Sequence, residues 1–131
     1  MIKVKILAES RYPVARKRLK KAIIDFLKKG GVTEASEIEV EVAIVGTRKM
    51  QKLNKDFLGV DEVTDVLSFP EEGEPGEKFV QKKQKFLSLG SVVVCYPRAQ
   101  EQANQRNVLV DDEVEELVIH GLKHLLGINH N

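Results

Sequence analysis

Polar and apolar residues repeat with two different periods along this chain, and the periods predict its elements. Strict alternation over residues 3–7 and 38–45 is typical of half-buried strands. Two short apolar runs, at residues 66–69 and 86–95, predict two further strands. The second run contains the uninterrupted stretch Val92–Cys95, which is too apolar for a sheet edge and therefore predicts a central strand.

Apolar residues spaced three and four apart predict helices in the segments between and after these strands. The four predicted helices cover, in order, residues 13–29, 47–57, 97–106 and 111–127. Pro13 suits a first helical turn, and Thr47 is a candidate N-cap. The last helix begins with Asp111, Asp112 and Glu113, acids that interact favourably with the positive end of the helix dipole.

Because strands alternate with helices, we expect an α+β fold of α/β-like character, in which helices cover a mixed, mostly parallel sheet of four to five strands. The 131 residues suffice for one domain with its own core, so we assign residues 1–131 to a single domain. Residues 71–85 are rich in Glu, Gly, Lys and Gln, and they predict a flexible excursion within this domain.

The composition bears on membrane contact, secretion and the cellular location of the protein. No apolar stretch approaches the about 20 residues that cross a bilayer, and the first residues alternate like a strand, so we expect no membrane contact and no signal peptide. Cys95 is the only cysteine, so we expect no internal disulfide and a cytoplasmic location. Aromatic residues make up only 5% of the chain, so any contact with RNA would rest mainly on charge.

The net charge of +1 hides an uneven distribution of charged residues. Residues 1–30 contain ten basic and two acidic residues, and residues 16–21 place five of the basic side chains on the first predicted helix. Such a cluster can follow a phosphate backbone, but it is also typical of an ordinary solvated helix face. The sequence leaves both interpretations open.

All three histidines lie near the end of the sequence, at positions 120, 124 and 130. His120 and His124 are four residues apart, so they share one face of the last helix and can reach a common ion. Gly127 can end this helix in a left-handed turn that brings His130 back toward them. Three imidazoles that leave one position for water are typical of a catalytic zinc site, so we expect one zinc ion and hydrolysis. The competing interpretation is three ordinary histidines.

The histidine spacing equals that of the long zinc-protease motif H-E-x-x-H-x-x-G-x-x-H. Gly121 stands where that motif has its general-base glutamate, so a peptidase mechanism lacks its proton acceptor here. A zinc hydrolase or peptidase with a different substrate is nevertheless an alternative. Parallel assays with RNA and peptide substrates distinguish an enzyme that hydrolyses RNA from one that hydrolyses peptides.

Acidic residues elsewhere are candidate partners of the histidines. Asp65 precedes an apolar strand, where it either projects a carboxylate toward the histidine helix or holds the local turn. Glu113 and Glu116 precede His120 by seven and four residues, and they either support an imidazole or lie on the surface. Cys95 is expected to be a small buried apolar residue.

Three blocks of the chain match the signatures of one protein family. Residues 120–130, H-G-L-K-H-L-L-G-I-N-H, resemble H-G-x-x-H-L-x-G-x-D-H. Leu53-Asn54 with the later T-D-V-L-S-F-P of residues 64–70 resembles L-N-x-x-[YF]-R…T-D-V-L-S-F-P, and L-G-S-V-V-V of residues 89–94 resembles L-G-D-[IL]-x-[IV]. The order and spacing of the blocks also match. The chain therefore resembles, from Val4 onward, the YbeY family of bacterial rRNA maturation endoribonucleases.

The resemblance implies a metal-dependent endoribonuclease that cuts single-stranded RNA in 16S rRNA 3′ end maturation and in ribosome quality control. It implies rRNA and the small ribosomal subunit as partners. It implies metal ligation by His120, His124 and His130, and catalytic positions at Asp65 and Ser91. These patterns assign no oligomeric state.

Three positions depart from the family pattern. Leu58 replaces the arginine after the aromatic residue, Ser91 the aspartate of L-G-D, and Asn129 the aspartate before the last histidine. Leucine cannot neutralise a phosphate, and serine is not an ionised base at neutral pH. An alternative interpretation is therefore a catalytically weakened, ribosome-associated RNA-binding factor. A large gain in cleavage after restoring Arg and Asp at positions 58 and 91 would favour this alternative.

Overall fold

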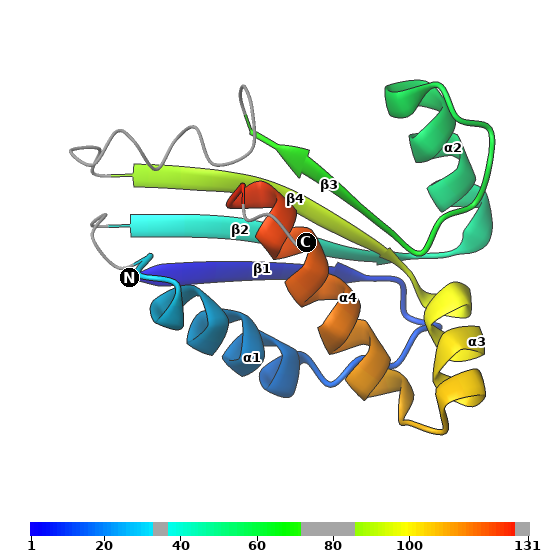
Figure 1. The fold of residues 1–131 in the computed structure, drawn as a ribbon, viewed down its shortest axis with the longest axis horizontal. Helices are drawn as coiled ribbons and strands as arrows, with labels where there is room; N and C mark the ends of the chain where they lie inside the picture. Colours follow the sequence, from blue (N-terminus) through cyan, green and yellow to red (C-terminus); the bar gives the residue numbers. More distant parts are fainter. Residues whose placement is uncertain (33–36, 72–85, 128–131) are drawn as a thin grey trace.

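The computed structural model describes residues 1–32, 37–71 and 86–127. Strands and helices alternate along the chain as the sequence predicts (Figure 1). The elements are, in order, β1 (Ile2–Ala8), α1 (Arg16–Lys29), β2 (Glu37–Val45), α2 (Thr47–Leu58), β3 (Val66–Pro70), β4 (Phe86–Cys95), α3 (Tyr96–Arg106) and α4 (Val110–Leu125). The predicted strands and helices are confirmed, whereas the predicted excursion of residues 71–85 falls, apart from Glu71, outside the described residues.

The described strands form one sheet with the order β1-β2-β4-β3. β1 pairs with β2 and β2 with β4 in parallel, whereas β3 runs antiparallel to β4. The expected mixed, mostly parallel sheet is therefore confirmed, with four strands in this part of the chain. β4 lies between β2 and β3, and its residues Val92 and Val94 are completely buried, which confirms that this apolar strand is central.

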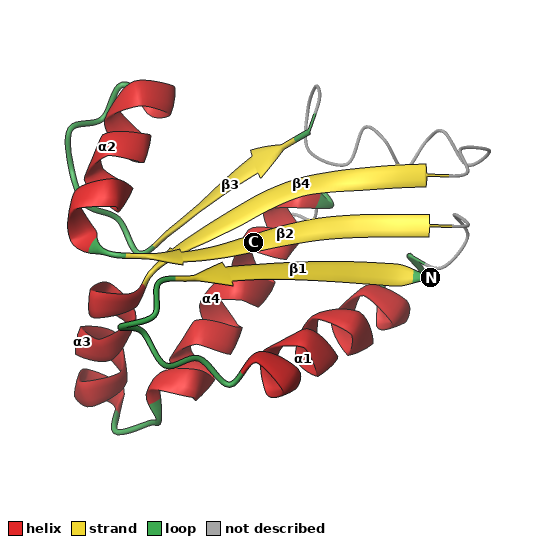
Figure 2. Ribbon diagram, turned by 180° about the vertical axis from the view of Figure 1, so that it is seen from behind, coloured by secondary structure: helices red, strands yellow, loops and turns green. Residues whose placement is uncertain are grey.

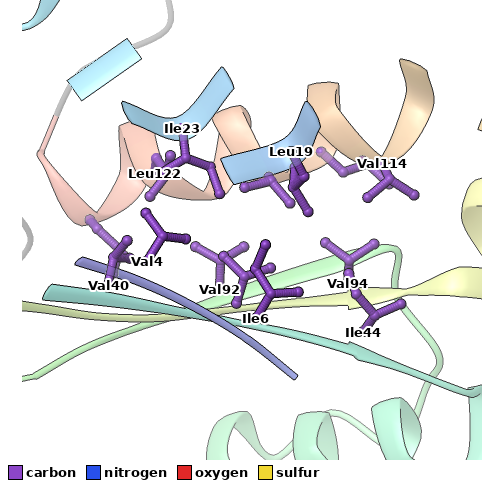
Figure 3. Packing of buried hydrophobic residues seen from close by; sticks show 14 of the residues in the cluster. Val4, Ile6, Leu19, Ile23, Val40, Ile44, Val92, Val94, Val114 and Leu122 are labelled. Atoms are coloured by element: carbon purple, nitrogen blue, oxygen red, sulfur yellow. The ribbon is translucent and has the colours of Figure 1, made fainter. Parts of the chain in front are cut away.

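Helices α1 and α4 pack on one face of the sheet and make the main core (Figure 1). Residues from both helices and from the strands interdigitate there, and Figure 3 labels Val4, Ile6, Leu19, Ile23, Val40, Ile44, Val92, Val94, Val114 and Leu122. α2 covers one end of the opposite face, where Met50 and Cys95 belong to a smaller cluster (Figure 2). Burial raises the pKa of the Cys95 thiol, so this cysteine is the small buried residue that the sequence predicts.

The start of α1 and the N-cap of α2 differ from the sequence prediction. α1 begins three residues after Pro13, because tertiary contacts hold the preceding segment. The Tyr96 hydroxyl donates to the Pro13 carbonyl oxygen (3.2 Å), and the Tyr12 ring stacks on the Tyr96 ring. α2 has Gly46 at its N-cap, and Thr47 is already helical. A Cβ added to Gly46 would lie 2.6 Å from the Tyr12 hydroxyl oxygen, so a larger residue here would have to displace the end of the Tyr12 side chain.

Arginines from two other helices neutralise the acidic start of α4. The ion pairs join Arg18 of α1 to Asp112 and Glu115, and Arg106 of α3 to Glu113 and Glu116. The expected acids are present in the first turn of α4, and they connect this helix to its neighbours in addition to facing the helix dipole. Within the described residues, no helix is long and apolar enough to cross a bilayer.

Candidate metal centre and substrate pocket

His120 and His124 lie side by side on the exposed surface of α4. Their ring centroids are 5.2 Å apart, and the ring planes are inclined by 70°. The four-residue spacing places both side chains on one helical face, one turn apart. The structure therefore brings two of the three predicted metal ligands together, as the helical period requires.

Gly121 explains how closely this helix approaches the sheet. A Cβ added to Gly121 would lie 2.6 Å from Cγ1 of Val92, a completely buried residue of β4. Only a hydrogen atom fits at this position, so α4 rests directly on the central strand. A glutamate at position 121 would point into the sheet and clash with Val92. The general base of the zinc-protease motif therefore has no place in this fold.

A pocket of about 350 Å³ lies beside the two histidines. Its lining comes from the end of α2, from β3 and the residues before it, and from α4, and consists of Leu58, Thr64, Asp65, Val66, Leu67, Ser68, His120, Gly121 and His124. β3 is an edge strand, so the pocket opens at the border of the sheet. The lining combines the apolar residues Leu58, Val66 and Leu67 with hydroxyl, carboxylate and imidazole groups.

Asp65 is held in this pocket through both its backbone and its side chain. Its carbonyl oxygen accepts a hydrogen bond from the Cys95 amide (2.9 Å). Its Oδ2 accepts from Nε2 of Gln102 in α3 (3.0 Å), and its Oδ1 accepts from the Thr64 hydroxyl (3.4 Å). Asp65 therefore lines the same pocket as the histidines, while its carboxylate bonds to α3 and to the adjacent Thr64, and its catalytic role stays a prediction. Each carboxylate oxygen keeps a lone pair for a further donor.

The loop between α2 and β3 is fastened by a buried asparagine. Asn54 is 5% exposed, and its Nδ2 donates to the Glu62 carbonyl oxygen (3.0 Å). Gly59 ends α2 in the left-handed conformation (φ 73°), and its amide donates to the Lys55 carbonyl oxygen (3.0 Å). These bonds set the position of Leu58 and of the chain that leads to Asp65. They give a physical reason for the asparagine of the Leu53-Asn54 block.

Ser91 does not belong to this pocket. It pairs with Glu41 and Phe69 across the sheet, and side chains of successive strand residues point to opposite faces. Its neighbour Val92 faces α4, so Ser91 faces the other side of the sheet. Ser91 therefore lies on the face of the sheet opposite to α4, away from the two described histidines, and its catalytic role stays a prediction.

Glu113 and Glu116 are occupied by an arginine of α3. Glu113 is 4% exposed, and its Oε1 accepts from Nη1 of Arg106 (2.7 Å). Glu116 accepts from the same nitrogen (2.6 Å) and lines a second hollow with His120 on the outer side of α4. Glu113 lies in the first turn of α4, as its expected interaction with the helix dipole requires, and it also anchors α3 to α4.

The basic cluster of α1 is largely engaged within the protein. Arg16 donates to the Ile6 carbonyl oxygen (2.7 Å), and Lys21 pairs with Asp25 (3.1 Å). Arg18 pairs with carboxylates of α4, so it is not a free phosphate ligand. The solvated-face interpretation therefore fits this helix better than a phosphate track.

The sequence analysis missed one residue of the pocket lining and one residue that bonds to the lining from outside. Ser68 lines the pocket from β3, and a polar residue inside the apolar run of residues 66–69 was a signal that could have identified it. Gln102 orients Asp65 from a helix 37 residues further along the chain. No local pattern marks Gln102, because its role depends entirely on how α3 packs beside the strand end.

The two described histidines fit the geometry of a shared zinc ion. Imidazole nitrogens bind zinc at about 2.0–2.1 Å, which places the centroids of two rings on one tetrahedral ion about 5 Å apart. The observed 5.2 Å satisfies this requirement. The third expected ligand, His130, lies outside the described residues, and no group of three possible ligands gathers within them.

Comparison with known proteins agrees with this geometry. The profile of the family described as Endoribonuclease YbeY matches residues 5–131. An Endoribonuclease YbeY of Brevibacillus brevis is 35% identical, and the match covers 99% of this chain and 85% of the relative. An Endoribonuclease YbeY of Thermus thermophilus is 37% identical, and the match covers 86% of this chain and 75% of the relative. A solution structure of a Thermotoga maritima protein is similar with a TM-score of 0.62 at 30% identity, over 98% of this chain and 75% of that one.

Proposed function

Since this chain belongs to the YbeY endoribonuclease family, we propose that it cuts single-stranded RNA at the pocket beside α4, using one zinc ion held by His120, His124 and His130. The chain is an enzyme, and its role is endonucleolytic cleavage of RNA in rRNA maturation. The proposed finer function is maturation of the 16S rRNA 3′ end and ribosome quality control. Its partners would then be single-stranded rRNA and the small ribosomal subunit in the cytoplasm.

The observation that carries this proposal is the position of the paired imidazoles at a pocket that also contains a fixed carboxylate. Hydrolysis of a phosphodiester needs charge stabilisation at the phosphate and an acceptor for the proton of the attacking water. In the proposal, His120 and His124 would supply the first through a bound ion, and Asp65 would supply the acceptor. The proposal is supported by the fact that these three residues line one pocket.

A zinc ion held by the histidines would supply Lewis-acid chemistry toward the attacking water and the phosphate. The side chains of the pocket do the rest. Asp65 takes the proton of the attacking water at a carboxylate oxygen as the water adds to phosphorus. The bond to the leaving oxygen breaks, and that oxygen takes up a proton from solvent. Gln102 and Thr64 keep that carboxylate oriented through their hydrogen bonds.

The metal assignment is tested on the full chain by elemental analysis and by cleavage of a single-stranded oligoribonucleotide. We expect one zinc per chain, and we expect His120→Ala and His124→Ala each to lower metal affinity and cleavage by more than about tenfold. Lys123→Ala is the matched control, because Lys123 lies on the same turn and is not an expected ligand. Circular dichroism checks that all variants fold. Full metal content and normal cleavage in His124→Ala would refute the assignment.

The peptidase alternative is tested in the same samples. A protein whose α4 rests on Val92 at Gly121 lacks the base that zinc peptidases use. We therefore expect no hydrolysis of an unstructured protein such as casein under conditions where RNA is cut. Metal-dependent cleavage of casein together with intact RNA would reverse the choice.

A further inference from the structure

An exposed leucine lines the same pocket as the paired histidines. Leu58 is 59% exposed at the end of α2, and it borders the cavity that contains His120 and His124. An apolar side chain left in water beside a reaction site offers surface that a ligand can cover. The pocket therefore has an apolar contact surface whose occupant the reaction chemistry alone does not identify.

Leu58 is held in place before any ligand arrives. The amide of Val60 donates to the Asn54 carbonyl oxygen (3.3 Å), and the amide of Gly59 donates to the Lys55 carbonyl oxygen (3.0 Å). The Asn54 side chain also ties the following loop to α2. A surface that is already ordered loses little conformational freedom on binding, so Leu58 is suited to a contact that contributes to affinity.

The distribution of polarity in the pocket restricts the chemistry of the occupant. His120, His124 and Asp65 suit a charged reacting group, whereas Leu58 and Val66 suit an uncharged face next to it. Single-stranded RNA has this combination, because each phosphodiester is flanked by a base with an apolar face. The ribose and the phosphate are both polar, so the base is the part of a nucleotide that an isobutyl group can cover favourably.

The charges around the pocket indicate on which side the strand lies. Arg48 and Lys49 are exposed at the start of α2. Lys52 and Lys55 are exposed further along this helix, where they form surface ion pairs with Asp56 (3.0 Å) and Asp61 (4.0 Å). On the outer side of α4, the hollow next to His120 contains Lys123 and three carboxylates, those of Asp112, Glu115 and Glu116. Arg18 and Arg106 pair with these carboxylates. The exposed cations of α2 therefore favour a polyanion on the α2 side of the histidines.

We propose that Leu58 packs against the face of the nucleobase adjacent to the cleaved phosphodiester, and that the basic side chains of α2 contact the phosphates beyond it. The proposal rests on the proposed function, that is, on RNA as the substrate of this pocket. It assigns the apolar wall to a base-binding subsite, in which the contact is with the face of the base and is therefore tolerant of sequence.

The test compares a short fluorescein-labelled oligoadenylate with a series in which one abasic nucleotide is moved along the strand. The zinc-loaded full chain and its Leu58→Ala variant are measured by fluorescence anisotropy. We expect Leu58→Ala to raise the Kd for the intact strand roughly three- to tenfold. We expect this difference to disappear when the abasic nucleotide occupies one particular position, because the base that Leu58 contacts is then missing.

Leu109→Ala is the matched control. Leu109 is a leucine of similar exposure, 67%, that precedes α4 and is not part of the lining of this pocket. Its removal should leave the Kd of all strands unchanged. Two results would overturn the proposal. In the first, the Leu58→Ala variant binds the intact strand with the Kd of the unchanged protein. In the second, it loses the same affinity for every abasic strand.

A second variant examines the nearest alternative occupant, which is the RNA backbone. If a phosphate lies at this position, Leu58→Arg should tighten binding and steepen the slope of log Kd against log salt by about 0.7. If a base lies there, the slope should stay unchanged, and a steeper slope would contradict the base contact. Failure of the unchanged protein to bind or cut any strand would refute the proposed function itself, whereas normal cleavage with an insensitive Leu58→Ala variant would refute only the subsite.

Discussion

Gly121 and Val92 are in such close contact that a Cβ on the glycine would lie 2.6 Å from Cγ1 and 3.0 Å from Cγ2 of the valine. This contact sets the distance between α4 and the central strand β4. Because His120 and His124 lie on the same helix, it also sets the height of the imidazoles above the edge of the sheet. The glycine of the histidine motif is thus a packing residue, and its neighbours carry the chemistry.

Substitution of Gly121 should therefore cost stability. The Val92 side chain is β-branched and completely buried, so it cannot move aside without disturbing the core. Overpacking outweighs the higher helix propensity of alanine, and we expect Gly121→Ala to lower the free energy of unfolding by about 1–2 kcal/mol. Urea denaturation measures the change.

The double variant provides the control for this prediction. Val92→Ala alone should destabilise by removing buried methyl groups. Combined with Gly121→Ala, it makes room for the new Cβ, so the two losses should be less than additive. Strict additivity, or a Gly121→Ala variant at least as stable as the unchanged protein, would show that the contact is not the constraint we describe.

Gln102 should act on catalysis through Asp65. It donates from α3 to Oδ2 of Asp65 at 3.0 Å, so it orients the carboxylate without lining the pocket itself. We expect Gln102→Leu to lower kcat about tenfold and to leave KM nearly unchanged, since an interaction that positions a base matters mainly in the transition state. Steady-state cleavage of a labelled oligoribonucleotide separates the two parameters.

The neighbouring Gln105 offers a matched control, because it lies on the exposed surface of the same helix. Gln105→Leu should leave both parameters unchanged. A rise in KM alone for Gln102→Leu would mean that this residue serves substrate binding and does not position Asp65.

Ser91→Asp should not restore catalytic power. Ser91 faces the side of the sheet opposite to α4, so a carboxylate there does not reach the histidines. We expect cleavage by Ser91→Asp to stay within about twofold of the unchanged protein. A large gain would support the weakened-factor interpretation and would show that residue 91 influences the pocket through the sheet.

The link between α1 and α4 should depend on pH in the acid range. The hydrogen bond from Arg18 to Asp112 holds the pKa of that carboxyl below its usual range. Because the pKa is lower in the folded than in the unfolded protein, the stabilisation is fully present above the ordinary aspartate pKa of about 4, and it is lost as the pH falls through the lower folded value.

Thermal unfolding of the unchanged protein and of Arg18→Ala between neutral and acid pH tests this link. We expect the unchanged protein to be more stable at neutral pH and the difference between the two to shrink below pH of about 4. Lys17→Ala, a neighbouring exposed residue of the same helix, should show no such convergence. A stability difference that is independent of pH would rule out the pair as its source.

Much of the fold could be predicted from the arrangement of apolar residues, because that arrangement shows which faces of a strand or helix are buried. The alternation of apolar residues in β1 and β2 and the continuous apolar run of β4 follow from which faces are buried, and the structure agrees with all three. The start of α1 could not be predicted this way. Pro13 is compatible with a helix, but the bond that holds it comes from Tyr96, which is far along the chain.

The sequence by itself determined the strands, the helices and the pairing of His120 with His124, because residues four apart on a helix must share a face. Only the tertiary structure decided which other residues join them. It brought Leu58, Asp65 and Ser68 to the histidines and turned Ser91 away. The physical reason is that the face of a strand and the neighbours of a helix end depend on how elements pack, and packing joins residues that no local period connects.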